Sequence, residues 1–178
     1  MSLKLNSLNY KLHTSIWQDL IRKLTRISKS NIKMLFPDKF DDKYYGWFRE
    51  IEQVAFREEL RYSFEEVREK VENKNSLFLF ILFDELPAAV ILGYSSQMDS
   101  KKVFFLDTIA IREKGRGIGT ILLKCFIEWL KKEEYLGIKV YTEEIDEKNI
   151  RLQNFYENLG FILETKDPNG NLNMTLWF

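Results

Sequence analysis

The sequence contains few of the residues that build disulfide frameworks and metal centres. Its 178 residues include one cysteine, Cys125, and one histidine, His13. A single cysteine cannot form an internal disulfide, and a single histidine excludes zinc or iron centres with several histidine ligands. We therefore expect no metal site. Cys125 also lies on the apolar stripe of an expected helix, where packing is a more common role than covalent catalysis.

Net charge and long hydrophobic runs are also lacking. The 27 basic and 27 acidic residues give a formal net charge of +0. Proteins that neutralise many phosphates carry a basic excess, so a nucleic-acid partner is not expected. No apolar run approaches the ~20 residues that span a bilayer, and residues 1–12 lack the apolar stretch of a signal peptide. These absences predict a cytoplasmic protein with no membrane partner.

Hydrophobic residues make up 45% of the chain and aromatic residues 15%, which is enough for a folded core. With only three prolines and no Gly/Ser-rich linker, the chain is expected to form one domain over residues 1–178. Apolar residues at helical spacing predict several helices. A capping box, formed by Ser63 and Glu66, marks the start of one of them. The expected helices are 14–28, 41–60, 63–73, 117–132 (closed by Gly137) and 149–159, and the expected strands are 77–83, 88–94, 103–111, 138–145, 161–165 and 173–178. This order predicts an α/β fold with a mixed sheet of about six to seven strands flanked by helices, in which 103–111 and 138–145 are parallel.

A glycine-rich loop separates the strand 103–111 from the helix 117–132. Residues 114–120 have the sequence KGRGIGT. Alternate glycines let the backbone turn sharply and approach a ligand closely, and the amides at the start of the helix favour an anion. Lys114 and Arg116 add positive charge. The loop lacks the Lys-Ser/Thr of a P-loop and the spacing of a dinucleotide fingerprint, so we predict a pyrophosphate site of another kind, with an ordinary strand-to-helix turn as the alternative.

A second motif follows about 30 residues later. Asn149 precedes Tyr156 by seven residues, and Gly160-Phe161 comes next. Together with the loop, this order resembles the GNAT acetyltransferase superfamily, whose acetyl-CoA loop is Gln/Arg-x-x-Gly-x-Gly/Ala. Lys114 stands where that family usually has Gln or Arg, and Leu152 replaces a small residue. The resemblance covers residues 77–178, while residues 1–76 carry no motif and are expected to shape the acceptor side.

The resemblance implies a GNAT-like fold and an N-acetyltransferase that moves an acetyl group from acetyl-CoA to a primary amine. The loop amides would hold the CoA pyrophosphate, and the strand ending at Ile111 would splay from its neighbour, so that its backbone binds pantetheine and polarises the thioester carbonyl. Asn149 would contact the cofactor arm. The implied acetyl-CoA contacts are Ile109, Ala110, Ile111, Lys114, Gly115, Arg116, Gly117, Ile118, Gly119, Thr120, Asn149 and Tyr156.

The resemblance makes Tyr156 the candidate general acid that protonates the leaving CoA thiolate. Periodicity alone also allows a core tyrosine, since Leu152, Phe155 and Tyr156 share one helical face. For the general base, Asp107 is a carboxylate in an otherwise apolar strand, which is costly unless the group is used or paired. Glu144, on the next strand, is the other candidate base.

Two other functions remain open at this point. The chain could be a CoA-binding sensor or interaction module without turnover, or it could transfer a longer acyl group. The acceptor could be a small-molecule amine or a protein amine, because the motifs do not reach the part of the chain that would select it. Exposed strand edges make a homodimer conceivable, but no feature specifies one.

Overall fold

The computed structural model describes residues 14–37, 39–73, 75–98, 101–146 and 151–178. One mixed sheet has the strand order β1-β2-β3-β4-β5-β7-β6. Its strands are β1 (Ile32–Leu35), β2 (Ser76–Phe83), β3 (Leu86–Met98), β4 (Lys101–Ile111), β5 (Gly137–Thr142), β6 (Ile162–Lys166) and β7 (Leu172–Trp177). The helices are α1 (Thr14–Ser28), α2 (Asp42–Ala55), α3 (Phe64–Glu72), α4 (Ile118–Lys132) and α5 (Leu152–Glu157), with a short 3₁₀ helix η1 (Glu58–Leu60).

The sheet confirms the predicted α/β fold with a mixed sheet of about seven strands. The strands β1 to β4 pair antiparallel in chain order, β4 and β5 pair parallel, and β5, β7 and β6 pair antiparallel. The parallel pair flanks α4, as expected for a strand-helix-strand crossover. Both edges of the sheet are therefore short strands, β1 and β6.

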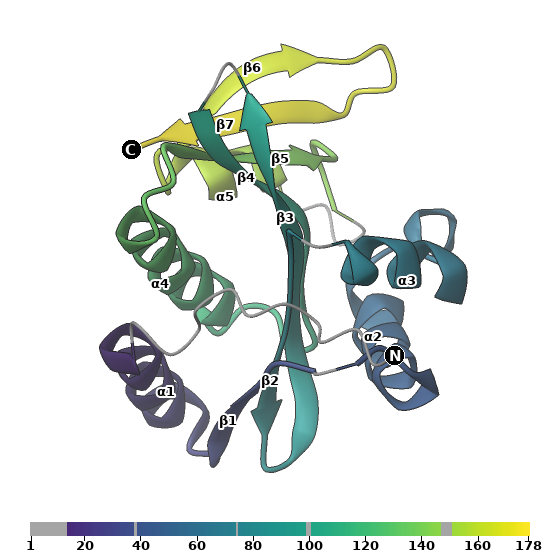
Figure 1. Cartoon of the computed structure of the whole chain (residues 1–178), viewed down its shortest axis with the longest axis vertical. Coiled ribbons are helices and arrows are strands. Elements are labelled where there is room, and N and C mark those ends of the chain that lie inside the picture. The colour runs from purple at the N-terminus through teal and green to yellow at the C-terminus, as the bar shows by residue number, and fades with distance from the viewer. Residues whose placement is uncertain (1–13, 38, 74, 99–100, 147–150) are drawn as a thin grey trace.

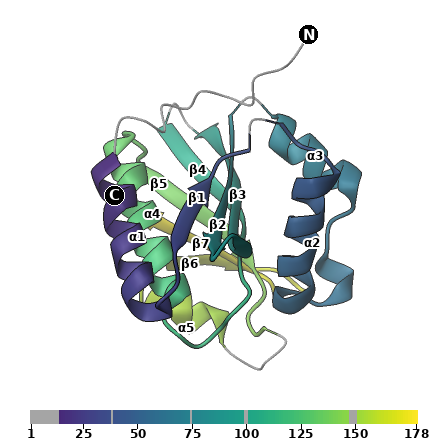
Figure 2. The same cartoon turned by 90° about the horizontal axis from the view of Figure 1, so that it is seen from below.

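Helices cover both faces of the sheet (Figures 1 and 2). The helices α1 and α4 lie against one face and α2 and α3 against the other. Two buried hydrophobic clusters correspond to these layers, one centred on α4 with residues such as Leu122, Phe126 and Trp129, and one beneath α2 with Phe48 and Ile51. The strand β2 is buried on both faces, which explains its continuous run of apolar residues.

Local signals place the starts of α2 and α3 within one residue of the predicted positions, whereas α5 spans Leu152–Glu157 and is shorter than the predicted helix 149–159. The carboxylate of Asp41 accepts a hydrogen bond from the Tyr44 amide at the start of α2. Both hydrogen bonds of the capping box between Ser63 and Glu66 are present at the start of α3. The helix α2 ends at Ala55, earlier than the predicted residue 60, because Phe56 is extended and its carbonyl accepts from the Arg61 guanidinium at 2.9 Å.

Three parts of the sequence prediction are corrected. The strand β1 was not predicted, since four residues are too few to show a period. Strands β3 and β4 are longer than predicted because they continue into a hairpin in which Met98 pairs with Lys101. Gly137 does not close α4 but begins β5, and a Cβ there would lie 2.7 Å from the Trp177 ring. The helix α4 ends at Lys132, and the chain turns away at Glu134, whose φ of 61° lies in the left-handed region.

Within the described residues, none of the helices is both long and apolar enough to cross a membrane.

Candidate active site

The parallel strands β4 and β5 separate part-way along their length. Their pairing runs from Val103 opposite Gly137 to Leu106 opposite Val140 and then ends. Beyond that point β4 continues beside β3, while β5 continues beside β7. Among the described residues, the β4 backbone after Leu106 therefore has no partner strand on its β5 side, as the family resemblance implied for the strand that ends at Ile111.

A β-bulge at Asp107 coincides with this separation. The register of β3 and β4 shifts so that Leu92 is opposite Thr108 while Gly93 is opposite Leu106, which leaves Asp107 as the extra residue. A bulge bends its strand and re-aims its side chains. The bulge at Asp107 requires a glycine at position 93, because a Cβ there would lie 2.4 Å from the Phe104 ring and 2.5 Å from the Phe105 carbonyl oxygen.

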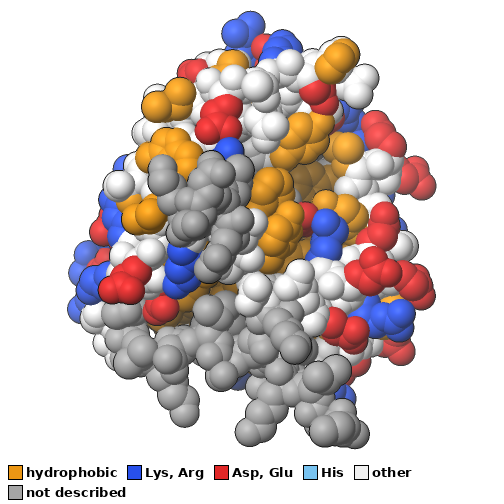
Figure 3. Space-filling model, turned by 45° about the horizontal axis from the view of Figure 1, so that its top comes forward, with side chains coloured by type: hydrophobic (Ala, Val, Ile, Leu, Met, Phe, Trp, Pro, Cys, Tyr) orange, Lys and Arg blue, Asp and Glu red, His pale blue; other side chains and the backbone are white. Residues whose placement is uncertain are grey.

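A cavity of about 680 Å³ occupies the space between the separated strands. A hollow lined by hydrophobic side chains, with acidic and basic side chains around it, is visible on the face drawn in Figure 3. The cavity has two walls, which we name after the two substrates that the resemblance implies. The donor wall is formed by residues 107–120 and α5, and the acceptor wall by residues 52–66, from the end of α2 to the start of α3, together with Glu143. The lining residues that the sequence predicted are Asp107, Ile109, Ala110, Ile111, Lys114, Gly115, Gly117, Ile118, Gly119, Thr120 and Tyr156.

The glycine loop has the backbone that an anion site requires. Gly115 and Gly117 have φ values of 88° and 73°, in the left-handed region, and a Cβ at either would meet open space. Gly117 is the N-cap residue of α4 and supplies no side chain to cap the first amides of the helix. Gly119 has a different role, since a Cβ there would lie 2.9 Å from Ile111 Cδ1. It lets the helix start pack closely on the end of β4.

The charged side chains of the loop make contacts within the protein. Lys114 lines the cavity, but its Nζ lies 3.0 Å from an Asp146 carboxylate oxygen and 3.4 Å from the Ala55 carbonyl oxygen. Arg116 is paired with Glu113 at 2.7 Å, and its side chain is about half exposed. Arg116 does not line the cavity, so in this conformation the predicted charge contribution rests on Lys114.

Tyr156 lies at the donor wall, on α5. Its side chain is buried, and it packs edge-to-face against Phe155 and Phe161. Burial raises the pKa of the Tyr156 hydroxyl well above its ordinary value of 10.0. Tyr156 therefore belongs to the core and also lines the cavity. A packing role in the core and the candidate role as general acid are compatible.

The Asp107 side chain is only 7% exposed, and both of its carboxylate oxygens have partners. One carboxylate oxygen lies 2.7 Å from Lys70 Nζ, and the other accepts from the Thr108 hydroxyl at 3.1 Å. A buried carboxylate needs such partners, because an unpaired one is costly. Lys70, on α3, was not identified from the sequence, because its 37-residue separation from Asp107 leaves no local pattern.

The structure does not bring Glu144, the other candidate base, to the cavity. Its carboxylate is paired with Lys166 on β6 at 2.5 Å, and the side chain is about one-third exposed. Its neighbour Glu143 lines the cavity instead and is paired with Arg57. β5 ends at Thr142, so the strand alternation no longer fixes which of the next two side chains turns inward.

The acceptor wall is held together by Tyr62 and Glu52, neither of which the sequence singled out. The Tyr62 amide donates to Glu52 at 3.1 Å, and the Tyr62 carbonyl accepts from the Tyr45 hydroxyl at 3.2 Å. Glu52 is buried, and that burial raises the pKa of its carboxyl group even though the Tyr62 amide and Arg49 act in the opposite direction. The aromatic residues of α2 belong to the core rather than to this wall: Phe48 is buried, and Tyr44, Tyr45 and Trp47 pack against the same cluster.

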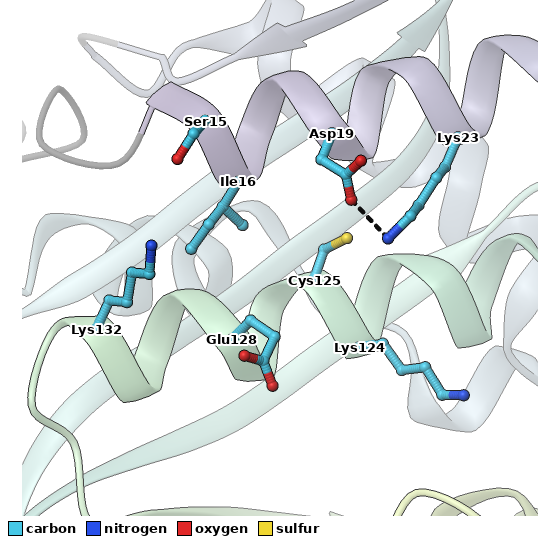
Figure 4. Close-up of a pocket in the computed structure, with 8 residues that line it drawn as sticks. All are labelled: Ser15, Ile16, Asp19, Lys23, Lys124, Cys125, Glu128 and Lys132. Atoms are coloured by element: carbon cyan, nitrogen blue, oxygen red, sulfur yellow. Dashed lines mark ion pairs between the residues drawn. The ribbon is translucent and has the colours of Figure 1, made fainter.

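A second, smaller cavity of about 280 Å³ lies between α1 and α4 (Figure 4). Figure 4 shows Asp19 pointing toward Lys23, with which it forms an ion pair, and Cys125 between the two helices. Cys125 is buried, and this burial raises the pKa of its thiol, which disfavours the reactive thiolate. This cavity lacks the glycine loop and the open strand backbone, so the cavity between β4 and β5 is the candidate active site.

Two residues considered in the sequence cannot be placed. Asn149 and His13 lie outside the described residues.

Comparison with known proteins agrees with this geometry. The model of the acetyltransferase (GNAT) family matches residues 40–161, which include the bulge, the glycine loop and Tyr156. The chain belongs to the GNAT acetyltransferase family. The match begins before α2, so the family region includes the acceptor wall, where the sequence showed no motif. No curated protein matches the sequence.

Solved structures share the GNAT fold at low sequence identity. The paiA N-acetyltransferase of Thermoplasma acidophilum, solved with coenzyme A, is 18% identical with a TM-score of 0.63, covering 83% of this chain and 99% of its own. The ribosomal-protein-S18-alanine N-acetyltransferase of Escherichia coli is 18% identical with a TM-score of 0.61, covering 82% and 93%. An aminoglycoside 6'-acetyltransferase type Ii is 17% identical with a TM-score of 0.65, covering 82% and 96%.

Proposed function

We propose that this protein transfers the acetyl group of acetyl-CoA directly to a primary amine in the cavity between β4 and β5. The observation that carries the proposal is the coincidence of three features in one cavity. These are the glycine loop at the start of α4, the β4 backbone that separates from β5 at Asp107, and the buried Tyr156.

The residues present fit acetyl-CoA. The open space in front of Gly115 and Gly117 is a cradle that any Cβ would fill, and the α4 N-terminus favours a negative charge there. Ile109, Ala110 and Ile111 line the cavity, and their backbone groups on the side of the gap would offer hydrogen bonds to an extended pantetheine arm. When bound, acetyl-CoA supplies a thioester that an amine can attack.

In this arrangement, the β4 backbone would orient the thioester and stabilise the negative charge that develops on its carbonyl oxygen. Asp107, at the start of the gap, would accept the proton that the acceptor amine must lose before or during attack. Its ion pair with Lys70 and its bond from Thr108 hold the carboxylate in one orientation.

Tyr156 would protonate the sulfur of the departing CoA. Because burial raises the pKa of Tyr156, its hydroxyl stays protonated throughout the neutral and mildly alkaline range. It can therefore donate a proton at any pH where the acceptor amine is reactive, and an alkaline loss of activity would have to come from another group.

The acceptor is proposed only as a class, a primary amine. The similar structures act on acceptors as different as a ribosomal-protein alanine and an aminoglycoside, judged by their names. The acceptor wall here combines Phe56, Leu60 and Tyr62 with the carboxylates of Glu59 and Glu143. This lining suits an amine carried on a partly apolar body.

Thermal unfolding with acetyl-CoA, CoA and NAD tests the proposal. A ligand at about 100 times its dissociation constant stabilises a protein by about 2.7 kcal/mol, so acetyl-CoA and CoA should raise the melting temperature clearly while NAD should not. A panel of primary amines, with release of free CoA thiol as the signal, should then show turnover. No stabilisation by either CoA species would refute the proposed site.

A further inference from the structure

The carboxylate proposed as the general base already holds an amine of the protein itself. Lys70 Nζ lies 2.7 Å from Asp107 Oδ1, the separation of a strong charge-assisted hydrogen bond. α3 directs the lysine there, because Val67 and Val71 on the same side of the helix are buried in the core. The Lys70 side chain is 28% exposed and that of Asp107 is 7% exposed, so the lysine is not sealed within the core.

The Lys70 amine lies beside the carboxylate that would take the proton of an acceptor amine. Asp107 is the first residue of β4 beyond its pairing with β5, next to the backbone that would present the thioester. Tyr62, which lines the acceptor wall, places its ring 4.6 Å from Lys70 Nζ. Lys70 is not itself a lining residue, but its Nζ contacts two residues that are, Asp107 and Tyr62, so the amine lies next to the acceptor end of the cavity.

We propose that the protein acetylates its own Lys70. The inference rests on the proposed function, since it requires acetyl-CoA in the cavity between β4 and β5. Asp107 accepts a proton from the Lys70 ammonium, and the Nζ lone pair forms a C–N bond with the thioester carbonyl carbon. The C–S bond breaks, its electron pair goes to sulfur, and Tyr156 supplies the proton that yields the CoA thiol. The second proton that the nitrogen loses on becoming an amide passes to the Tyr156 phenolate, and the proton on Asp107 is released to solvent. The product is a neutral Nζ-acetyl-lysine.

The rate of this reaction should rise with pH. Burial lowers the pKa of Lys70, but the hydrogen bond and charge of Asp107 outweigh it, so the pKa is raised overall. Other titratable groups that act on this lysine are Tyr62, Tyr94 on β3 and Glu66 one helical turn earlier. A raised pKa leaves a small fraction of neutral amine at pH 7, and that fraction grows tenfold for each pH unit below the pKa.

A matched lysine serves as the internal control. Lys139 on β5 is paired with Glu164 at 2.9 Å, and its side chain is 17% exposed. Neither Lys139 nor Glu164 lines the cavity, whereas Asp107, the partner of Lys70, does. Spontaneous acetylation by acetyl-CoA should affect Lys70 and Lys139 to a similar degree. Enzymatic acetylation should affect only Lys70.

The experiment incubates the purified full chain with acetyl-CoA alone at pH 7, 8 and 9 and maps acetylated lysines by peptide mass spectrometry. We expect at least tenfold higher occupancy at Lys70 than at Lys139, increasing with pH. Asp107→Asn and Tyr156→Phe should each reduce the Lys70 signal at least tenfold, whereas Glu164→Gln should not. Thermal unfolding of every variant with and without CoA verifies folding and cofactor binding, and Tyr156→Phe keeps the test valid if Asp107→Asn does not fold.

The possible failures are distinguishable. If acetyl-CoA stabilises the protein but Lys70 stays unmodified, self-acetylation is refuted and the proposed function stands. If Lys70 and Lys139 are modified equally, or if the Lys70 signal persists in Tyr156→Phe, the modification is spontaneous and the inference is refuted. If acetyl-CoA neither binds nor modifies the chain, both proposals fail.

Discussion

The two walls of the cavity are built in different ways. The donor wall is largely one continuous stretch, from the bulge at Asp107 through the glycine loop to the first turn of α4. Its proposed ligand-binding groups are backbone amides and carbonyls, and its glycines are required by positive φ values or by close approach. The acceptor wall is held by side chains that connect distant segments, such as Glu52 with the Tyr62 amide and Arg57 with Glu143.

This difference explains why one wall carries a recognisable motif and the other does not. Where the backbone itself binds the ligand, the sequence must contain glycine at fixed positions, since only glycine leaves the space open. Where side chains bind it, many residue combinations give similar geometry. The donor wall should therefore respond to single glycine substitutions, and the acceptor wall should respond to changes in charge and hydrogen bonding.

The largest effect on turnover is expected at Tyr156, which packs in the core and is the proposed general acid. Tyr156→Phe removes only a hydroxyl, so turnover with an accepted amine should fall by about 10²–10⁴-fold, the range for losing a general acid, with little change in CoA affinity. Tyr135→Phe is the control, since Tyr135 is equally buried but does not line the cavity. Steady-state kinetics and calorimetric CoA binding check this prediction. Full activity of Tyr156→Phe would assign the residue to the core alone.

Gly117→Asp should weaken CoA binding on the order of 100-fold, or about 2.7 kcal/mol, because it places a carboxylate where the pyrophosphate would lie. Gly170→Asp is a matched control, since Gly170 also has a positive φ (90°) but lies in the turn between β6 and β7. Isothermal titration with CoA measures both. Equal affinity in the two variants would mean that the loop of the donor wall is only a turn.

Gly93→Ala should disturb the bulge where the two walls meet. Its new methyl group would overlap the Phe104 ring and the Phe105 carbonyl, which should destabilise the fold by about 1–3 kcal/mol. Gly46→Ala, in α2, meets nothing within 4 Å and should instead stabilise by about 0.5–1 kcal/mol. Urea unfolding of both variants gives the sign and size. A neutral Gly93→Ala would show that the bulge does not depend on this glycine.

The smallest effects are expected from two carboxylates of the acceptor wall, and they should have opposite signs. Burial raises the folded-state pKa of Glu52, so its contribution to stability is complete below its ordinary pKa of 4.5 and is lost as pH rises through the folded value. Hydrogen bonds from Ser63 lower the pKa of Glu66, so its contribution is present at neutral pH and lost as pH falls.

Melting temperatures measured from pH 4 to pH 7.5 separate the two cases. Relative to the unsubstituted protein, Glu52→Gln should gain stability as the pH rises, whereas Glu66→Gln should lose it. The same trend in both variants would contradict the assigned environments, and with them the account of how the acceptor wall is tied to α2.

The sequence by itself determined the order of elements from β2 onward, the capping box of α3, the glycine loop and the place of Tyr156 within its motif. Each of these depends on residues close together in the chain, through hydrogen bonds, φ restrictions or a helical period. Gly137 shows the limit of such reasoning, because a glycine that appears to end a helix is required instead by the Trp177 ring of another strand.

Only the tertiary structure decided which carboxylate lies in the cavity and what it contacts. Asp107 and Glu144 were equivalent candidates in the sequence, but the bulge opposite Gly93 directs one inward, and an ion pair with Lys166 on β6 holds the other outside. Packing also decided that Glu52 and Tyr62 line the cavity and that Lys70 contacts Asp107. Their positions are set by packing between segments distant in the chain, and such contacts leave no local pattern in the sequence.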